Sequence, residues 1–67
     1  MYKEKFAENL KNLINGQPVP KIAKAIGIPT QTLYDYIRCK CEIKIETLAK
    51  IADYFDEDID FLIGRKL

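Results

Sequence analysis

Histidine is absent from this chain of 67 residues, and cysteine occurs only at Cys39 and Cys41. The chain also shows no paired nucleophile and base and no glycine-rich phosphate loop. Two thiols do not supply the four ligands of a structural zinc site. We therefore predict neither an enzyme nor a metal or cofactor site. The cysteines are interpreted as free, reduced thiols, with a redox switch as the alternative.

Long apolar runs are also missing. No run approaches the roughly 18 residues that a membrane-spanning helix needs, and Met1 opens a charged segment rather than a signal peptide. We therefore predict a cytoplasmic protein with no membrane partner. The length leaves room for one small domain, residues 1–67. A core of this size is marginal, which favours stabilisation by a second copy.

The net charge is only +1, but the charges are unevenly distributed. Residues 1–52 hold nine Lys and Arg against five Asp and Glu, and residues 53–67 hold two against five. A basic region can attract phosphate even in a nearly neutral chain, because the local potential steers binding. Ordinary solvated surface would show the same asymmetry, so it carries little weight alone.

The stretch from Pro18 to Arg38 reads as two short helices broken at Gly27. Apolar residues of the first recur at helical spacing: Val19, Ile22, Ala23 and Ile26. Gly27 suits the left-handed conformation that closes a helix and turns the chain. The second helix, residues 30–37, follows Pro29 and turns three residues inward: Leu33, Tyr36 and Ile37. Such a pair predicts a helix-turn-helix, whose second helix reads the DNA major groove.

Three further helices are predicted around this pair. The first runs from about Tyr2 to Asn15 with an apolar face of Phe6, Leu10, Leu13 and Ile14. The fourth has an apolar face of Ile45, Leu48, Ile51, Ala52 and Phe55. The last is short, with Asp58 as N-cap, Gly64 as C-cap and three inward residues, Ile59, Leu62 and Ile63. The prediction is a compact all-α domain of five helices.

Several short motifs lie in a fixed order along the chain: Ile22-Ala23, Ile26-Gly27-Ile28, Thr32-Leu33, Arg38-Cys39-Lys40, Thr47 to Ala52, and Leu62-Ile63-Gly64. By these motifs, residues 10–64 resemble the helix-turn-helix domains of the Cro and phage-repressor family, also called Xre-like regulators. The resemblance implies a lambda-repressor-like fold and a DNA-binding transcriptional regulator that needs no cofactor.

The resemblance also implies roles for individual residues. Base edges would be contacted by Thr30, Gln31, Tyr34 and Asp35. Among these Gln31 is the leading candidate, because a carboxamide pairs with adenine through two hydrogen bonds. The DNA backbone would be contacted by Thr32, Arg38, Lys40, Lys44 and Lys21.

The chain departs from the family pattern at four positions. Val19 replaces a glutamine that contacts phosphate, and Pro29 replaces a serine or threonine cap. Ile37 stands where the family often has an ion-pairing glutamate, and Cys39 stands where it has glycine. We therefore expect DNA binding to depend on residues 30–37 and on the loop from Arg38 to Lys44.

The predicted function is that of a repressor that inserts residues 30–37 into the major groove of double-stranded DNA and blocks a promoter or operator. A homodimer is expected, with no small-molecule effector evident. Phe61 is interpreted either as a dimer contact or as an aromatic packed on the terminal segment. The alternative function is a protein-interaction module, antitoxin-like or adaptor, that keeps the fold without reading bases.

Overall fold

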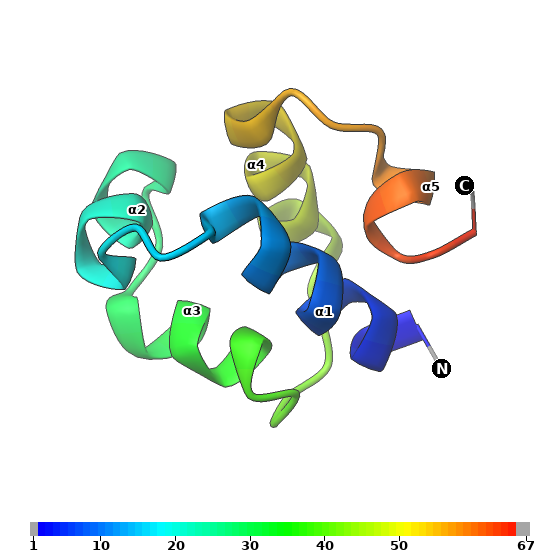
Figure 1. Cartoon of the computed structure of the whole chain (residues 1–67), viewed down its shortest axis with the longest axis horizontal. Helices are drawn as coiled ribbons and strands as arrows, with labels where there is room; N and C mark the ends of the chain where they lie inside the picture. Colours follow the sequence, from blue (N-terminus) through cyan, green and yellow to red (C-terminus); the bar gives the residue numbers. More distant parts are fainter. Residues whose placement is uncertain (1, 66–67) are drawn as a thin grey trace.

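Five α-helices occur in residues 2–65, the part of the chain that the computed structural model describes (Figure 1). They are α1 (Tyr2–Ile14), α2 (Val19–Ile26), α3 (Thr30–Ile37), α4 (Ile45–Phe55) and α5 (Ile59–Leu62). No strand occurs in this range, and the predicted all-α architecture is confirmed. The prediction that involves Met1 lies outside the described residues. No helix within residues 2–65 is long and apolar enough to cross a membrane.

One hydrophobic core joins all five helices. It consists of ten buried residues: Phe6, Leu10, Ile14, Ile22, Ala23, Leu33, Tyr36, Ile51, Ala52 and Leu62. Helix α1 packs against α3 and α5, and α2 packs against α3 and α4. The rings of Phe6 and Tyr36 pack edge to face with their centroids 5.9 Å apart, and this contact joins α1 to α3. The inward orientation predicted for Tyr36 is confirmed, because the residue is only 3% exposed.

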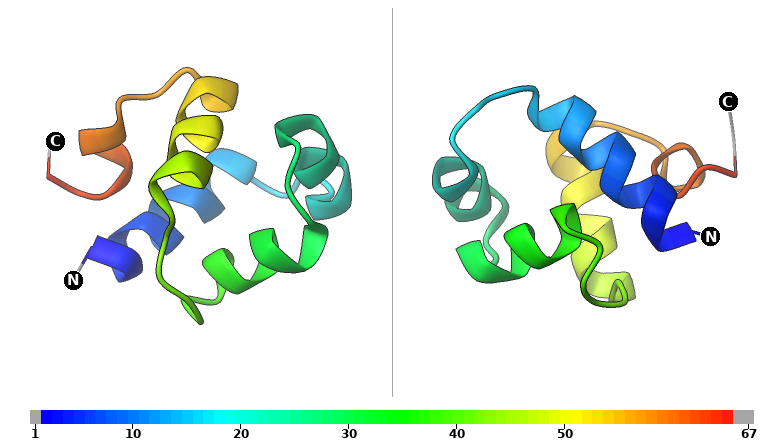
Figure 2. Two further views of the ribbon diagram at one scale, coloured as in Figure 1. Left: turned by 180° about the vertical axis from the view of Figure 1, so that it is seen from behind. Right: turned by 60° about the horizontal axis from the view of Figure 1, so that its bottom comes forward.

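The turn between α2 and α3 is made by Gly27, which has a φ of +93°. Its N–H and that of Ile28 both donate to the carbonyl oxygen of Ala23, at 2.9 and 3.0 Å. This is the glycine-closed helix end that the sequence predicts, and it satisfies a carbonyl that the helix leaves free. The turn directs the chain so that α3 packs against α2 and leaves one side of α3 at the surface (Figure 2).

The prediction is wrong for two residues that it assigns to the core. Ile45 is 82% exposed and Ile59 is 40% exposed. Each is the first residue of its helix, α4 and α5 respectively, and neither belongs to the buried core. The periodic pattern alone contains no information on how far the packed region extends along a helix.

The predicted helix ends need only small corrections. Helix α1 ends at Ile14, and Asn15 already has a left-handed φ of +47°. Asp58 is the N-cap of α5 as predicted, because its carboxylate accepts a hydrogen bond of 2.9 Å from the N–H of Asp60. The C-cap of α5 is Ile63, and Gly64 takes the left-handed conformation one residue later.

Candidate nucleic-acid interface

The outer side of α3 carries the residues predicted to contact bases. Gln31 is exposed, whereas Thr30, Tyr34 and Asp35 are half-buried, and Arg38 is exposed at the C-cap. The opposite side of the helix is held in the core by Leu33 and Tyr36. In the right-hand view of Figure 2, α3 comes forward to the near surface of the molecule. The four candidate residues are therefore carried by a helix that the core holds in place.

Two contacts between side chains one helical turn apart order this surface. Nε2 of Gln31 donates to Oδ1 of Asp35 at 3.0 Å. The guanidinium of Arg38 lies over the ring of Tyr34, 5.1 Å from its centroid. Neither contact was predicted from the sequence, although the spacing of four residues within a helix indicates such pairs.

A groove of about 390 Å³ separates α3 from the segment that leads into α4. Thr32 and Asp35 line it from α3, Lys44 lines it from the segment before α4, and Thr47 lines it from the first turn of α4. Two predicted backbone contacts, Thr32 and Lys44, are therefore brought to one place although they are far apart in the sequence. The exposed side chain of Ile45 follows Lys44 directly. Ile45, which was predicted to lie in the core, is therefore a surface residue next to one of the predicted backbone contacts.

The cations predicted to contact the DNA backbone are available for a ligand. All four are exposed and form no ion pair with the described residues: Lys21, Arg38, Lys40 and Lys44. In contrast, Lys3 pairs with Glu42 at 3.4 Å. The hydrogen bond and charge of Glu42 raise the pKa of Lys3. The one acidic residue of the segment between α3 and α4 is thus paired with a cation of α1.

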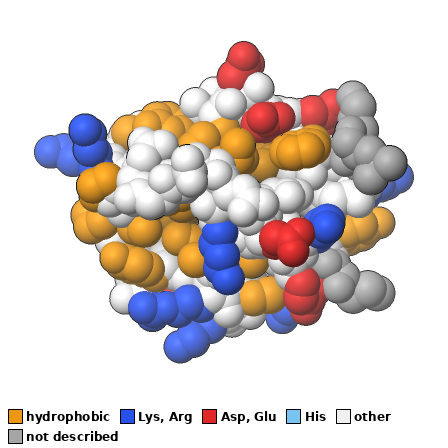
Figure 3. Space-filling view, viewed as in Figure 1, with side chains coloured by type: hydrophobic (Ala, Val, Ile, Leu, Met, Phe, Trp, Pro, Cys, Tyr) orange, Lys and Arg blue, Asp and Glu red, His pale blue; other side chains and the backbone are white. Residues whose placement is uncertain are grey.

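Negative charge gathers at the other end of the molecule. Five acidic residues lie between the last turn of α4 and α5, namely Asp53, Asp56, Glu57, Asp58 and Asp60. Figure 3 shows Lys and Arg side chains at the left and lower left, where α2 and α3 lie, acidic side chains at the top, and side chains of both signs on the right. The acidic residues of the last part of the chain are therefore grouped around the end of α4 and α5.

Three helices begin without a side-chain cap. The N-cap residues Pro18, Pro29 and Lys44, at the starts of α2, α3 and α4, make no side-chain hydrogen bond to the first turn. Only α5 among the described helices with an assigned N-cap has one, from Asp58. Uncapped N–H groups and the positive end of the helix dipole favour anions such as phosphate. These helix starts therefore suit an anionic ligand better than a capped start would.

Comparison with known protein families decides the class of the chain. A helix-turn-helix family model matches residues 21–62, which is more than half of the chain and includes α3 and the segment that follows it. The chain belongs to the Cro/C1-type helix-turn-helix family. The match confirms the resemblance to the Cro and phage-repressor family and the lambda-repressor-like fold class. The members of this family are DNA-binding regulators. No curated protein and no solved structure matched the chain.

Cys39 replaces the family glycine after α3 without changing the course expected of the backbone. Its φ is +61°, the left-handed conformation that glycine adopts without strain. The N–H of Cys39 donates to the carbonyl of Tyr36 at 3.1 Å, and the N–H of Lys40 donates to that of Asp35 at 2.8 Å. These two hydrogen bonds close the helix in the way that a glycine after the C-cap usually does, although Cys39 has a Cβ.

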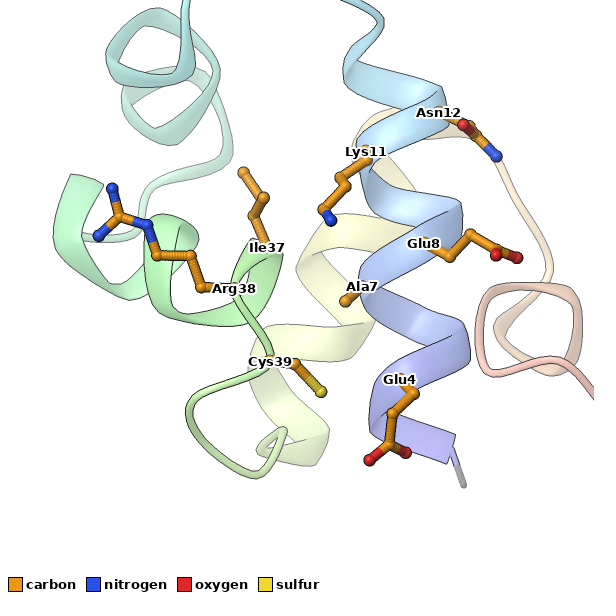
Figure 4. A pocket seen from close by; sticks show the side chains of 8 residues that line it. All are labelled: Glu4, Ala7, Glu8, Lys11, Asn12, Ile37, Arg38 and Cys39. Carbon is orange, nitrogen blue, oxygen red and sulfur yellow. The ribbon is translucent and has the colours of Figure 1, made fainter.

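A hollow of about 300 Å³ lies between α1 and the end of α3. Figure 4 shows Lys11 and Cys39 pointing into the space between the two elements, whereas Arg38 extends away from α1. The thiol is thus on the α1 side of the chain and the guanidinium on the outer side. This division leaves Arg38 free to contact a ligand while Cys39 closes the helix.

The two thiols are free. Burial raises the pKa of Cys41, and the charges of Asp35 and Glu42 raise it further. A redox-sensing cysteine needs a lowered pKa, because the thiolate is the reactive form. The environment of Cys41 is therefore that of an unreactive thiol. Within residues 2–65, no group of His, Cys, Asp and Glu is arranged to hold a metal ion.

Phe61 is half-buried, and its backbone helps to hold α5 on α1. Nδ2 of Asn9 donates to the carbonyl oxygens of Phe61 and Leu62, at 2.9 and 3.0 Å. The partial exposure of the ring is compatible with both predicted roles, dimer contact and packing on the terminal segment. Its role in a dimer stays a prediction.

Proposed function

We propose that this helix-turn-helix protein is a sequence-specific repressor that inserts α3 into the major groove and blocks a promoter or operator. In this proposal base edges are read by Thr30, Gln31, Tyr34 and Asp35, and the DNA backbone is held by Thr32, Arg38, Lys40, Lys44 and Lys21. The main support for the proposal is the polar outer side of α3. It is accompanied by cations that form no ion pair with the described residues and by helix N-termini without a side-chain cap. Phosphates would satisfy both of these flanking features.

We further propose that the protein acts in the cytoplasm as a single-domain chain, residues 1–67, that forms a homodimer. Helix α3 has 8 residues and is therefore about 12 Å long, which is enough to contact only a few base pairs. Two copies on adjacent half-sites would double the contacted sequence. Phe61 is the proposed dimer contact because its ring is partly exposed on the short terminal helix. Regulation would come from protein concentration and dimerisation rather than from a small-molecule effector.

A salt titration on random duplex DNA tests DNA binding itself. Each phosphate contact contributes about −0.9 to the slope of log K against log salt, so four cations predict about −3.6 per copy. This slope corresponds to about a 150-fold loss of affinity between 50 and 200 mM salt. Lys40→Gln and Lys44→Gln should each make the slope shallower by about 0.9.

Lys50→Gln is the matched control for these variants. Lys50 is also exposed, but it lies on α4 beside Asp53 and Tyr54, on the side facing α2. Its substitution should leave the slope unchanged. A wild-type protein that is folded by circular dichroism and binds no DNA at 50 mM salt would contradict the proposal.

The second candidate function is a protein-interaction module that keeps the fold. It is favoured by Val19, which replaces the phosphate-contacting glutamine of the family, and by the carboxylate of Asp35 on the surface that would face DNA. Folded protein without DNA affinity would select this alternative.

A further inference from the structure

We propose that Asp35 is a positioning residue that orients the amide of Gln31 and thereby sets a preference for adenine at one position of the bound sequence. The inference rests on the proposed function, because it assigns a mechanism to the base-reading surface of α3. Its starting point is the hydrogen bond of 3.0 Å from Nε2 of Gln31 to Oδ1 of Asp35.

The carboxylate decides which way the amide of Gln31 faces. A glutamine amide carries one acceptor oxygen and two N–H donors, whereas an ionised carboxylate only accepts. The atom of Gln31 that meets Asp35 is therefore the nitrogen, and the flipped amide would place two oxygens against each other. One N–H is used in this contact. The carbonyl oxygen and the second N–H remain for a ligand.

This remaining pair of groups matches adenine. In the major groove adenine presents an N6 amino donor beside the N7 acceptor, so it needs one acceptor and one donor from the protein. Guanine presents two acceptors, O6 and N7, and would need two donors. Because Asp35 occupies one N–H of Gln31, the residue cannot supply two donors to a single guanine. The contact therefore selects adenine over guanine.

The inference gives Asp35 an indirect role in place of the direct base contact proposed above, and its position fits that role. Oδ1 of Asp35 already accepts from Gln31, and the residue lines the groove opposite Lys44. Asp35 is half-buried whereas Gln31 is exposed. The exposed amide thus reaches further toward a ligand than the carboxylate that holds it. An exposed pair of this kind contributes only about 0.2–0.5 kcal/mol to the helix, so removing it should leave the fold intact.

The test begins with selection of binding sites from a random duplex library by the wild-type protein. The preference for A·T over G·C is then measured at the position where Gln31→Ala loses it. Asp35→Ala should reduce this preference at least about fivefold, the lower end of the range for one bidentate base contact. Asp35→Asn keeps an acceptor oxygen without the charge and should retain most of the preference. The ratio is compared rather than the affinity, because removing a negative charge strengthens binding to all DNA.

A double substitution shows whether Asp35 acts through Gln31. In a Gln31→Ala background, Asp35→Ala should leave the base preference unchanged, because the group that it positions is already absent. A full preference for adenine in Asp35→Ala would overturn the inference, and so would an equal effect of Asp35→Ala in both backgrounds. A library that yields no enriched sequence would instead overturn the proposed function, and the inference with it.

Discussion

Replacing Cys39 by glycine tests whether the end of α3 is strained. Cys39 holds a φ of +61° so that its N–H and that of Lys40 can satisfy the last carbonyls of the helix. A residue with a Cβ pays about 1–2 kcal/mol for the left-handed conformation. Glycine avoids this cost, but its greater freedom in the unfolded chain destabilises the native state by about 0.5–1 kcal/mol relative to alanine.

Cys39→Ala is the matched comparison. It removes the thiol just as glycine does, but it keeps the Cβ and therefore the strain. The difference in the free energy of unfolding between the two variants isolates the backbone contribution. Relief of the left-handed strain outweighs the greater freedom of glycine in the unfolded chain, so we expect Cys39→Gly to be more stable than Cys39→Ala by about 0.5–1 kcal/mol. For a domain of this size the difference corresponds to about 2–8 °C in melting temperature.

Urea unfolding followed by far-ultraviolet circular dichroism measures this difference, and both variants should keep the same m-value. DNA binding by Cys39→Gly should match that of the wild type, because the neighbouring Arg38 and Lys40 keep their backbone positions. An alanine variant as stable as the glycine variant would refute the argument that the positive φ is costly.

Two further predictions concern other backbone and thiol positions. Gly27→Ala should cost about 0.5–1 kcal/mol, because the left-handed φ is strained but the added methyl meets open space. Gly64→Ala should cost at least about 1 kcal/mol more, because its methyl would collide with the side chain of Lys5; equal losses in urea unfolding would contradict the packing there. In the Cys39→Gly variant, alkylation of Cys41 by iodoacetamide should show a higher pH midpoint in the folded protein than in the urea-unfolded chain, since burial raises the pKa of this thiol. The free energy of unfolding should accordingly fall as the pH rises past the pKa of Cys41 in the unfolded chain, about 8.5, because the unfolded thiol ionises first. An alkylation midpoint in the folded protein at or below that of the urea-unfolded chain would refute the raised pKa of Cys41.

The sequence by itself determined the helices and their order. Each helix has its own apolar period and its own end signal, such as Gly27 after α2 or Asp58 before α5, and these are local properties. The motifs sufficed for the family as well, because they lie in the right order along residues 22–64, and the family model matches residues 21–62. The residues proposed to read bases were likewise found from the sequence, since a helical period places them on one side of α3.

Only the tertiary structure decided what surrounds each of these residues. Periodicity gives the direction of a side chain around its own helix, but not where the neighbouring helix stops, and for this reason Ile45 and Ile59 were wrongly placed in the core. The groove that brings Thr32 opposite Lys44 depends on the path of the chain between α3 and α4. That path in turn depends on Cys39 adopting a conformation that sequence rules assign to glycine.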